Sequence, residues 1–186
     1  MSGTPPTDPT PPGPSLLEAA VLVPVFRDSG GALRLVLVRR AEVGIHGGQL
    51  AFPGGKRDPG DGSSLATALR EAHEEIGLAP GSVTVLATLP VVEVRVTGYR
   101  IAPFLARVVT PPAWCPAADE VAEVLEARVA DLARPEAQGE SLERIPGWSE
   151  PVLIRYYRIG PHRLWGASYR IVEPLLPRLL AGEWTV

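Results

Sequence analysis

The chain has little cysteine, almost no lysine and no long apolar run. Cys115 is the single cysteine among 186 residues, which excludes an intrachain disulfide and is typical of a reducing compartment. No metal-ligand grouping surrounds Cys115, so we interpret it as a buried small hydrophobe or a bystander. No stretch approaches the roughly 18 apolar residues of a transmembrane helix, and the first residues lack the pattern of a secretory leader. We therefore expect a cytoplasmic protein with no membrane partner.

Positive charge is not in excess either. Lysine and arginine together number 18 against 21 acidic residues, the net charge is −3, and Lys56 is the only lysine. Binding to nucleic acid as a polyanion needs a basic surface, so we expect no nucleic-acid partner. The hydrophobic share of 45% and the charged share of 21% are those of an ordinary globular protein, and the length suffices for one buried core. No internal repeat is present.

Proline is concentrated at the start of the chain. Residues 1–15 hold six prolines and no large apolar residue beyond Met1. This composition predicts a disordered or polyproline tail, which we interpret as a plain tail rather than a docking segment. Residues 16–186 are expected to form the single folded domain.

Three glutamates stand out further along the chain. Glu71, Glu74 and Glu75 have the spacing i, i+3 and i+4, which places them on one face of a helix. Like charges at this spacing repel by a few tenths of a kcal/mol per pair. The ordinary interpretation is a solvated helix face. The alternative is a hard divalent cation, which prefers oxygen ligands.

The neighbouring residues favour the metal. Ser63 or Ser64 can cap the start of a helix, and Gly77 can end it. The expected helix is therefore short, and it has an apolar stripe away from the glutamates, formed by Leu65, Leu69, Ala72 and Ile76. Residues 52–62, just before it, are glycine-rich and predict a loop whose backbone can approach a ligand closely. Such a loop and an acidic helix suit a metal that bridges carboxylates and substrate phosphates.

Residues 55–78 resemble the box of Nudix hydrolases. That box runs Gly, five residues, Glu, seven residues, Arg-Glu, an aliphatic residue, any residue, Glu-Glu, any residue, Gly and an aliphatic residue. The second half matches at Arg70-Glu71, Glu74-Glu75 and Gly77-Leu78, with Ala72 as a smaller aliphatic residue. The first half departs from it, because Asp61 replaces the glutamate and eight residues separate it from Arg70.

Both departures are similar to the coenzyme A pyrophosphatase-like branch of the family. That branch also has a segment His-x-Gly-Gln-x-x-Phe-Pro-Gly-Gly, which matches residues 46–55 here. Further likenesses are residues 98–103, 120–124 and 164–167, and the resemblance covers roughly residues 17–182. The branch usually carries Leu-Arg ahead of the histidine, where this chain has Val43-Gly44. The resemblance implies Mg²⁺- or Mn²⁺-dependent hydrolysis of coenzyme A or a derivative to 3′,5′-ADP and a 4′-phosphopantetheine product.

The resemblance also assigns roles to the box residues. Glu71, Glu74 and Glu75 would be metal ligands, and Gly55 would offer its carbonyl oxygen or simply permit the turn. Glu74 and Glu75 are also expected to take part in catalysis. Arg70 would pair with a neighbouring carboxylate and hold the cluster in shape; the alternative is an ordinary surface salt bridge.

The general base is expected outside the box. Glu120 lies in the segment where many Nudix enzymes place it, with Glu123 and Asp119 as alternatives. A purely structural interpretation, in which Glu120 caps the segment that follows it, stays open. Asp61 could add a contact outside the metal's inner sphere.

Substrate-binding candidates are spread along the chain. His46 could contact a phosphate or shape the glycine-rich loop. Guanidinium groups bind phosphate bidentately, and the candidates for the 3′-phosphate of coenzyme A are Arg39, Arg40, Arg57 and Arg100. Tyr99 could stack on adenine. The alternatives are ordinary surface charges for the arginines and a core position for Tyr99.

The remaining pattern predicts an α+β fold. Strands are expected at residues 19–25, 33–39, 84–89, 91–96, 101–108 and 152–159. Residues 122–133 fit a strand or a helix, residues 134–150 fit a polar, turn-rich insertion, and residues 165–180 fit a closing helix that Pro174 and Pro177 should kink or divide. The resemblance implies the Nudix α/β/α sandwich with a mixed β-sheet.

Other functions fit the same residues. Within the family, the substrate could be ADP-ribose, a dinucleoside polyphosphate or an oxidised or ordinary nucleoside triphosphate. Outside catalysis, the chain could be a nucleotide-binding module, although such copies usually lose one of the three box glutamates. In every case the partner is a small-molecule diphosphate, and a homodimer is possible.

Overall fold

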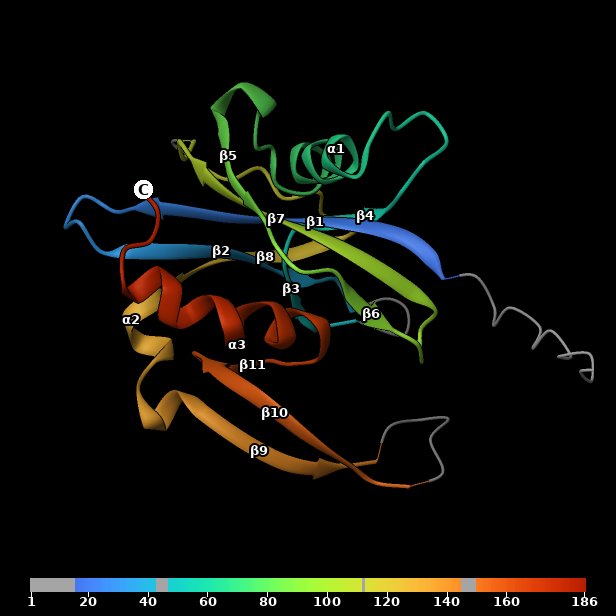
Figure 1. Cartoon of the computed structure of the whole chain (residues 1–186), viewed down its shortest axis with the longest axis vertical. Coiled ribbons are helices and arrows are strands. Elements are labelled where there is room, and N and C mark those ends of the chain that lie inside the picture. Colours follow the sequence, from blue (N-terminus) through green and yellow to red (C-terminus); the bar gives the residue numbers. More distant parts are fainter. Residues whose placement is uncertain (1–15, 43–46, 112, 145–149) are drawn as a thin grey trace, which may run out of the picture.

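The computed structural model describes residues 16–42, 47–111, 113–144 and 150–186. The N-terminal tail predicted at residues 1–15 and the candidate His46 lie outside these ranges. The described chain forms a main β-sheet between two helices, with a smaller sheet beside it (Figure 1).

The main sheet is mixed, as the sequence led us to expect. Its strands are β1 (Leu17–Arg27), β2 (Leu33–Arg40), β3 (Leu50–Ala51), β4 (Gly54–Lys56), β5 (Val83–Thr88), β6 (Val92–Val94), β7 (Tyr99–Val108) and β8 (Val121–Arg128). Strand β1 pairs in parallel with β7 and antiparallel with β2 and β4. Strand β8 runs antiparallel to β2 along nearly the whole of β2.

Two helices cover the two faces of this sheet. Helix α1 (Ser64–Ile76) lies on one face and α3 (Gly166–Leu180) on the other (Figure 1). Strands β1 and β2 are apolar on both sides because both faces are covered. Leu22 and Val36 pack with α1, whereas Leu35 and Leu37 pack with α3. The α+β sandwich with a mixed sheet is therefore confirmed.

The second sheet corrects the prediction for residues 134–150. It consists of β9 (Gln138–Glu143), β10 (Val152–Ile159) and β11 (His162–Leu164), so this region is more than a polar insertion. The sequence of β9 lacks the apolar alternation that predicts a strand, because none of its residues is buried in the structure. Its place is set by packing: a Cβ at Gly139 would overlap the ring of Tyr156 on β10.

Residues 122–133 contain both predicted structures. Strand β8 ends at Arg128, and the short helix α2 (Val129–Leu132) follows at once. Two single 3₁₀ turns, Pro80–Ser82 and Pro135–Ala137, precede β5 and β9.

Three further predictions are wrong in part. Strand β4 replaces part of the loop expected at residues 52–62, because Gly54 and Gly55 pair with β1 without side chains that would mark a strand. The prolines were expected to kink or divide the closing helix, and the division is wrong, because α3 runs undivided through Pro174 and Pro177. An interior proline costs about 3 kcal/mol, whereas each buried large apolar side chain stabilises by about 1.5–3 kcal/mol, and α3 buries five of these. Cys115 is exposed, so of its two interpretations the buried hydrophobe is wrong and the bystander stays open.

Candidate active site

Helix α1 begins and ends where its sequence predicts. The Ser63 hydroxyl accepts a hydrogen bond from the Ala66 amide at 3.1 Å. Gly77 ends the helix in the left-handed conformation with φ of 71°, and its amide donates to the His73 carbonyl at 2.9 Å. These caps set the two ends of the helix that carries the three glutamates.

Glu75 is buried between α1 and the sheet. Its side chain is nearly inaccessible, and Oε2 accepts a hydrogen bond from the Gly54 amide at 2.9 Å. Burial raises the pKa of Glu75 to about 7, although the Gly54 hydrogen bond and the charge of Arg40 oppose the rise. Gly54 has φ of 154°, and a Cβ there would lie 2.3 Å from the Ala20 carbonyl oxygen, so only glycine allows β4 to run this close to β1.

Glu71 faces the backbone of β4. A Cβ on Gly55 would lie 2.5 Å from Oε1 of Glu71, so no side chain can separate this strand from the carboxylate. Burial raises the pKa of Glu71, and the charges of Glu74 and Glu120 add to the rise while Arg70 opposes it. Glu74 is 56% exposed. The three glutamates therefore share a helix face but not an environment.

Arg70 joins the acidic side chains into one network. Its Nε and Nη2 donate to the two carboxylate oxygens of Asp61, both at 3.0 Å. Its Nη1 lies 2.9 Å from an oxygen of Glu71 and 2.9 Å from one of Glu74. Such forked arginine–carboxylate contacts are stronger than neutral hydrogen bonds.

Asp61 is a residue whose main contact the sequence did not reveal. Besides Arg70, it accepts hydrogen bonds from the Thr67 hydroxyl at 2.9 Å and from the Asp58 amide at 3.0 Å. The Arg70 guanidinium and these donors hold the pKa of Asp61 well below its usual range. The available clue was the changed spacing in the box: the loop is one residue longer and its acid one methylene shorter. Asp61 thereby ties the loop to the first turns of α1.

Glu120 lies close to the helix glutamates. Its negative charge contributes to the raised pKa of both Glu71 and Glu75. The Ala117 amide, three residues earlier, donates to the backbone carbonyl of Glu75 at 2.9 Å, and the Glu120 carbonyl accepts from the Ala41 amide at 2.8 Å. The exposed side chain of Glu120 is thus carried by a loop that is hydrogen-bonded to α1 itself.

The other candidate bases lie differently. The carboxylate of Glu123 is 3.5 Å from Nε of Arg39 and 3.6 Å from Nε2 of His162, which belongs to β11. Asp119 is exposed and neighbours Glu120 on the same turn. Neither Glu123 nor Asp119 is among the largest causes of the raised pKa of Glu71 or Glu75.

The predicted substrate-binding residues do not all gather at one place. Arg40 lies near Glu75, and its positive charge partly opposes the rise in the pKa of Glu75. Arg57 lines a hollow beside the acidic residues, and Arg100 pairs with Glu18 at 3.6 Å near the same hollow.

Arg39 and Tyr99 fall on the other face of the main sheet. Side chains alternate along a strand, so Arg39 shares the face of Leu37 and Tyr99 shares that of Leu105, both on the α3 side. The glutamates of α1 lie on the opposite face. His46 lies outside the described residues.

The acidic residues suit a cation in charge and in donor type. We call Asp61, Glu71, Glu74, Glu75 and Glu120 the acid cluster. Among the described residues, Arg70 contacts three of these carboxylates and Arg40 lies near Glu75, and carboxylate oxygens are the ligands that Mg²⁺ and Mn²⁺ prefer. Among the described residues, no three side chains are already arranged as a metal site. Ligation would require Glu71 and Glu74 to exchange their contacts with Arg70 for the metal.

Comparisons with known proteins identify the family and agree with the fold. The NUDIX domain family matches residues 16–145. A protein of Citrobacter koseri, described as an uncharacterized Nudix hydrolase NudL, is 38% identical over 152 residues, which cover 82% of this chain and 72% of that protein. A protein of Salmonella paratyphi B with the same description has the same identity and coverage.

Solved structures share the architecture. The Nudix hydrolase RenU of M. smegmatis has a TM-score of 0.61 at 22% identity, covering 91% of this chain and 89% of RenU. The C. elegans Ap4A hydrolase has a TM-score of 0.52 at 22% identity, covering 62% of this chain and 82% of that one. The chain therefore belongs to the Nudix family and is a hydrolase of that class. Within the part of the chain that the structure describes, no helix is long and apolar enough to cross a membrane.

Proposed function

We propose that this enzyme hydrolyses the diphosphate of coenzyme A or a derivative. Water adds to one phosphorus, the bridging P–O bond breaks, and the products are 3′,5′-ADP and a 4′-phosphopantetheine compound. The observation that supports the substrate is residues 46–55, which resemble the coenzyme A pyrophosphatase-like branch and end at Gly55 against the Glu71 carboxylate.

The acid cluster supports a metal-dependent reaction. Nudix enzymes in general use divalent cations such as Mg²⁺ or Mn²⁺. Glu71, Glu74, Glu75 and the Gly55 carbonyl would hold the cation. A bound cation neutralises phosphate charge and lowers the pKa of water. Arg70, held by Asp61, contacts both Glu71 and Glu74, and Glu71 lies against Gly55 of β4.

Glu120 is our proposed general base. It is exposed, so a water molecule can reach it, and its loop is hydrogen-bonded to α1 near Glu75. Replacing Glu120 with Gln should lower kcat while the affinity for Mn²⁺, measured by calorimetry, changes little. An equal loss in Glu123→Gln with full activity in Glu120→Gln would assign the base to Glu123 instead.

The direct test uses the purified full chain. Incubation with coenzyme A and Mg²⁺ or Mn²⁺ should release 3′,5′-ADP, detected by chromatography, and chelation should stop the release. No turnover of coenzyme A, together with turnover of ADP-ribose, would overturn the substrate and leave the reaction class intact.

A second candidate is hydrolysis of ADP-ribose, dinucleoside polyphosphates or nucleoside triphosphates. Two proteins with the same fold are the reason to include these nucleotides in the assay. One is the C. elegans Ap4A hydrolase. The other is the NUDIX domain of Shewanella oneidensis NrtR, whose structure was solved in complex with ADP-ribose and which is 22% identical to this chain with a TM-score of 0.50. A chain that binds these nucleotides without any turnover would instead be the non-catalytic module.

We further propose a cytoplasmic location and a homodimeric state. The single cysteine fits a reducing compartment. Sedimentation of the full chain tests the dimer: a single species at the monomer mass of 19.8 kDa at micromolar concentration would contradict it.

A further inference from the structure

An open hollow of about 410 Å³ lies at the end of the main sheet, next to the acid cluster. The start of β1 and the loop from β4 to α1 line it. The lining residues are Leu16, Leu17, Glu18, Lys56, Arg57, Asp58, Pro59 and Asp61. Asp61 belongs to both the hollow and the Arg70 network, so the two sites share a wall.

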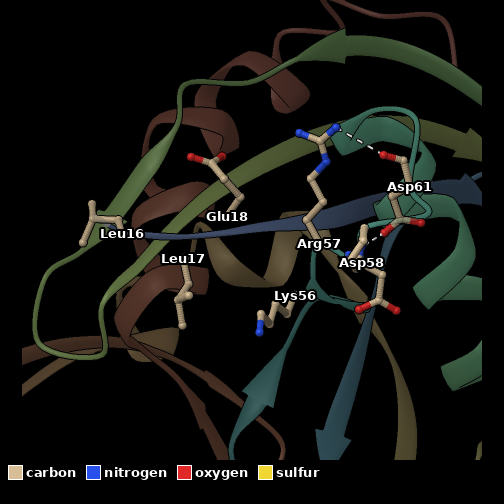
Figure 2. A pocket seen from close by; sticks show the side chains of 8 residues that line it. Leu16, Leu17, Glu18, Lys56, Arg57, Asp58 and Asp61 are labelled. Atoms are coloured by element: carbon tan, nitrogen blue, oxygen red, sulfur yellow. Dashed lines mark hydrogen bonds between the residues drawn. The ribbon is translucent and has the colours of Figure 1, made fainter. Parts of the chain in front are cut away.

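Side chains from both faces of the sheet reach this hollow (Figure 2). Glu18 and Arg57 extend to one side of β1, and Leu17 and Lys56 extend to the other. This is possible because β1 begins and β4 ends here, so no further strand residue closes the opening. Arg57 is oriented by a hydrogen bond from Nη2 to the Asp61 carbonyl oxygen at 3.2 Å.

The acids around the hollow already have partners. Arg70 holds Asp61 bidentately and lies 3.7 Å from Asp58. Glu18 lies 3.6 Å from Nη1 of Arg100.

The two cations that line the hollow have no such ion-pair partner among the described residues. Lys56 and Arg57 are exposed, and among the described residues neither has a carboxylate oxygen within 4.0 Å. Lys56 and Arg57 are therefore the cations of the hollow that no described carboxylate contacts, whereas Arg70 and Arg100 beside it are each paired with an acid.

The hollow and the acid cluster are linked through three consecutive residues. Gly55 lies against Glu71, and Lys56 and Arg57 follow at about 3.3 Å of rise per residue. The backbone carbonyl of Lys56 also accepts a hydrogen bond from Nη2 of Arg70 at 3.3 Å. A ligand held at the acid cluster would thus reach Lys56 and Arg57 with a group a few bonds away from its diphosphate.

We propose that this hollow is a second anion site, in which Lys56 and Arg57 bind a phosphate that the substrate carries outside its diphosphate. A lysine ammonium and an arginine fork are the side chains that bind phosphate most strongly. The inference rests on the proposed function, for which the group is the 3′-phosphate of coenzyme A. It makes Lys56, the only lysine in the chain, a specificity determinant.

The test compares two nucleotides that differ by one phosphate and contain no diphosphate to hydrolyse. Calorimetry with Mg²⁺ present should show 3′,5′-ADP binding about tenfold or more tightly than 5′-AMP, since a contact with a charged group is lost in AMP. Lys56→Met and Arg57→Met should each reduce this ratio, and the double variant should bring it close to one. Lys56→Met is the easier variant to interpret, because the Lys56 side chain makes no hydrogen bond with the described residues and the substitution therefore breaks none.

Arg107→Met is the matched control. Arg107 is an exposed arginine at the other end of β7 and should leave the ratio unchanged. Equal affinity of the natural chain for the two nucleotides, or an unchanged ratio in the double variant, would overturn the second anion site.

Hydrolysis assays separate this inference from the proposed function. If coenzyme A yields no 3′,5′-ADP but nucleotide discrimination depends on Lys56, the substrate is wrong and the anion site stands. The opposite outcome is that the natural chain hydrolyses coenzyme A and dephospho-coenzyme A with equal kcat/KM, and that Lys56→Met leaves both values unchanged. In that outcome the function stands and the anion site is wrong.

Discussion

Helices α1 and α3 cover opposite faces of the same sheet, and both carry arginine–carboxylate contacts. In α3, Nε of Arg178 lies 2.7 Å from Glu183, but the two side chains are 45% and 43% exposed. In α1, Arg70 meets Asp61, whose side chain is only 7% exposed, and it also reaches Glu71 and Glu74. The same chemical pair is thus an isolated surface contact in one helix and the centre of a network in the other. Burial and shared partners, rather than residue type, separate the two.

The largest expected effect is on catalysis at α1. Replacing Glu75 with Gln keeps the shape of the side chain but removes a proposed metal ligand. We expect kcat/KM to fall by about a hundredfold or more, because a metal contributes several kcal/mol to charge stabilisation. Steady-state assays with saturating Mg²⁺ measure this loss. Glu183→Gln, the matched change beside α3, should have no effect, and equal losses in both variants would contradict the comparison.

The next effect is on stability as a function of pH. Burial raises the pKa of Glu75 to about 7 from 4.5, so the folded chain keeps a proton that the unfolded chain releases. Stability is therefore fully present below pH 4.5 and falls as the pH rises toward about 7, by an amount on the order of 3 kcal/mol. Urea unfolding with a chelator at pH 5 and pH 8 measures the difference.

Two controls belong to that experiment. Glu75→Gln should remove most of the slope with pH, since it has no proton to lose. Saturating Mg²⁺ should stabilise the natural chain more at pH 8 than at pH 5, because an ionised Glu75 is the better ligand. If the dependence of stability on pH persists unchanged in Glu75→Gln, it arises from other ionisable groups.

A smaller effect is expected from the partner of Arg70. Asp61→Asn retains the size of the side chain but leaves Arg70 without its bidentate partner. We expect a lower melting temperature and lower activity, because Glu71 and Glu74 then share a less firmly held guanidinium. Asp58→Asn is the control, since Asp58 lies 3.7 Å from Arg70 and is 64% exposed. If both variants melt alike, Asp61 does not organise the site.

The smallest effect is expected at α3. Arg178→Ala removes an exposed ion pair and a stacking contact, with the guanidinium 4.6 Å from the ring centroid of Trp184. Exposed pairs contribute little, so the melting temperature should change less than in Asp61→Asn, and kcat/KM should not change. Differential scanning fluorimetry of the two variants side by side tests the ranking.

Local patterns predicted the elements that have a clear period or a cap. The limits of α1 follow from Ser63 and Gly77, and the apolar runs of β1 and β2 mark strands buried on both faces. Strands without such a pattern were missed: β4 consists largely of glycine, and β9 has no buried residue. A kink or a division was expected in helix α3 because the cost of its prolines is local, whereas its stabilising contacts come from distant strands.

The candidate site divides in the same way. The sequence by itself determined the family, the helix and the three glutamates on one face, because these depend on residue order and on the period of a helix. Only the tertiary structure decided that Glu75 is buried, that Asp61 takes Arg70, and that Arg39 and Tyr99 lie on the opposite face from the glutamates. It also set Lys56 and Arg57, which no carboxylate of the described residues contacts, beside the acid cluster. The reason is physical: burial and ion pairing depend on which distant strands meet, and no local spacing encodes that meeting.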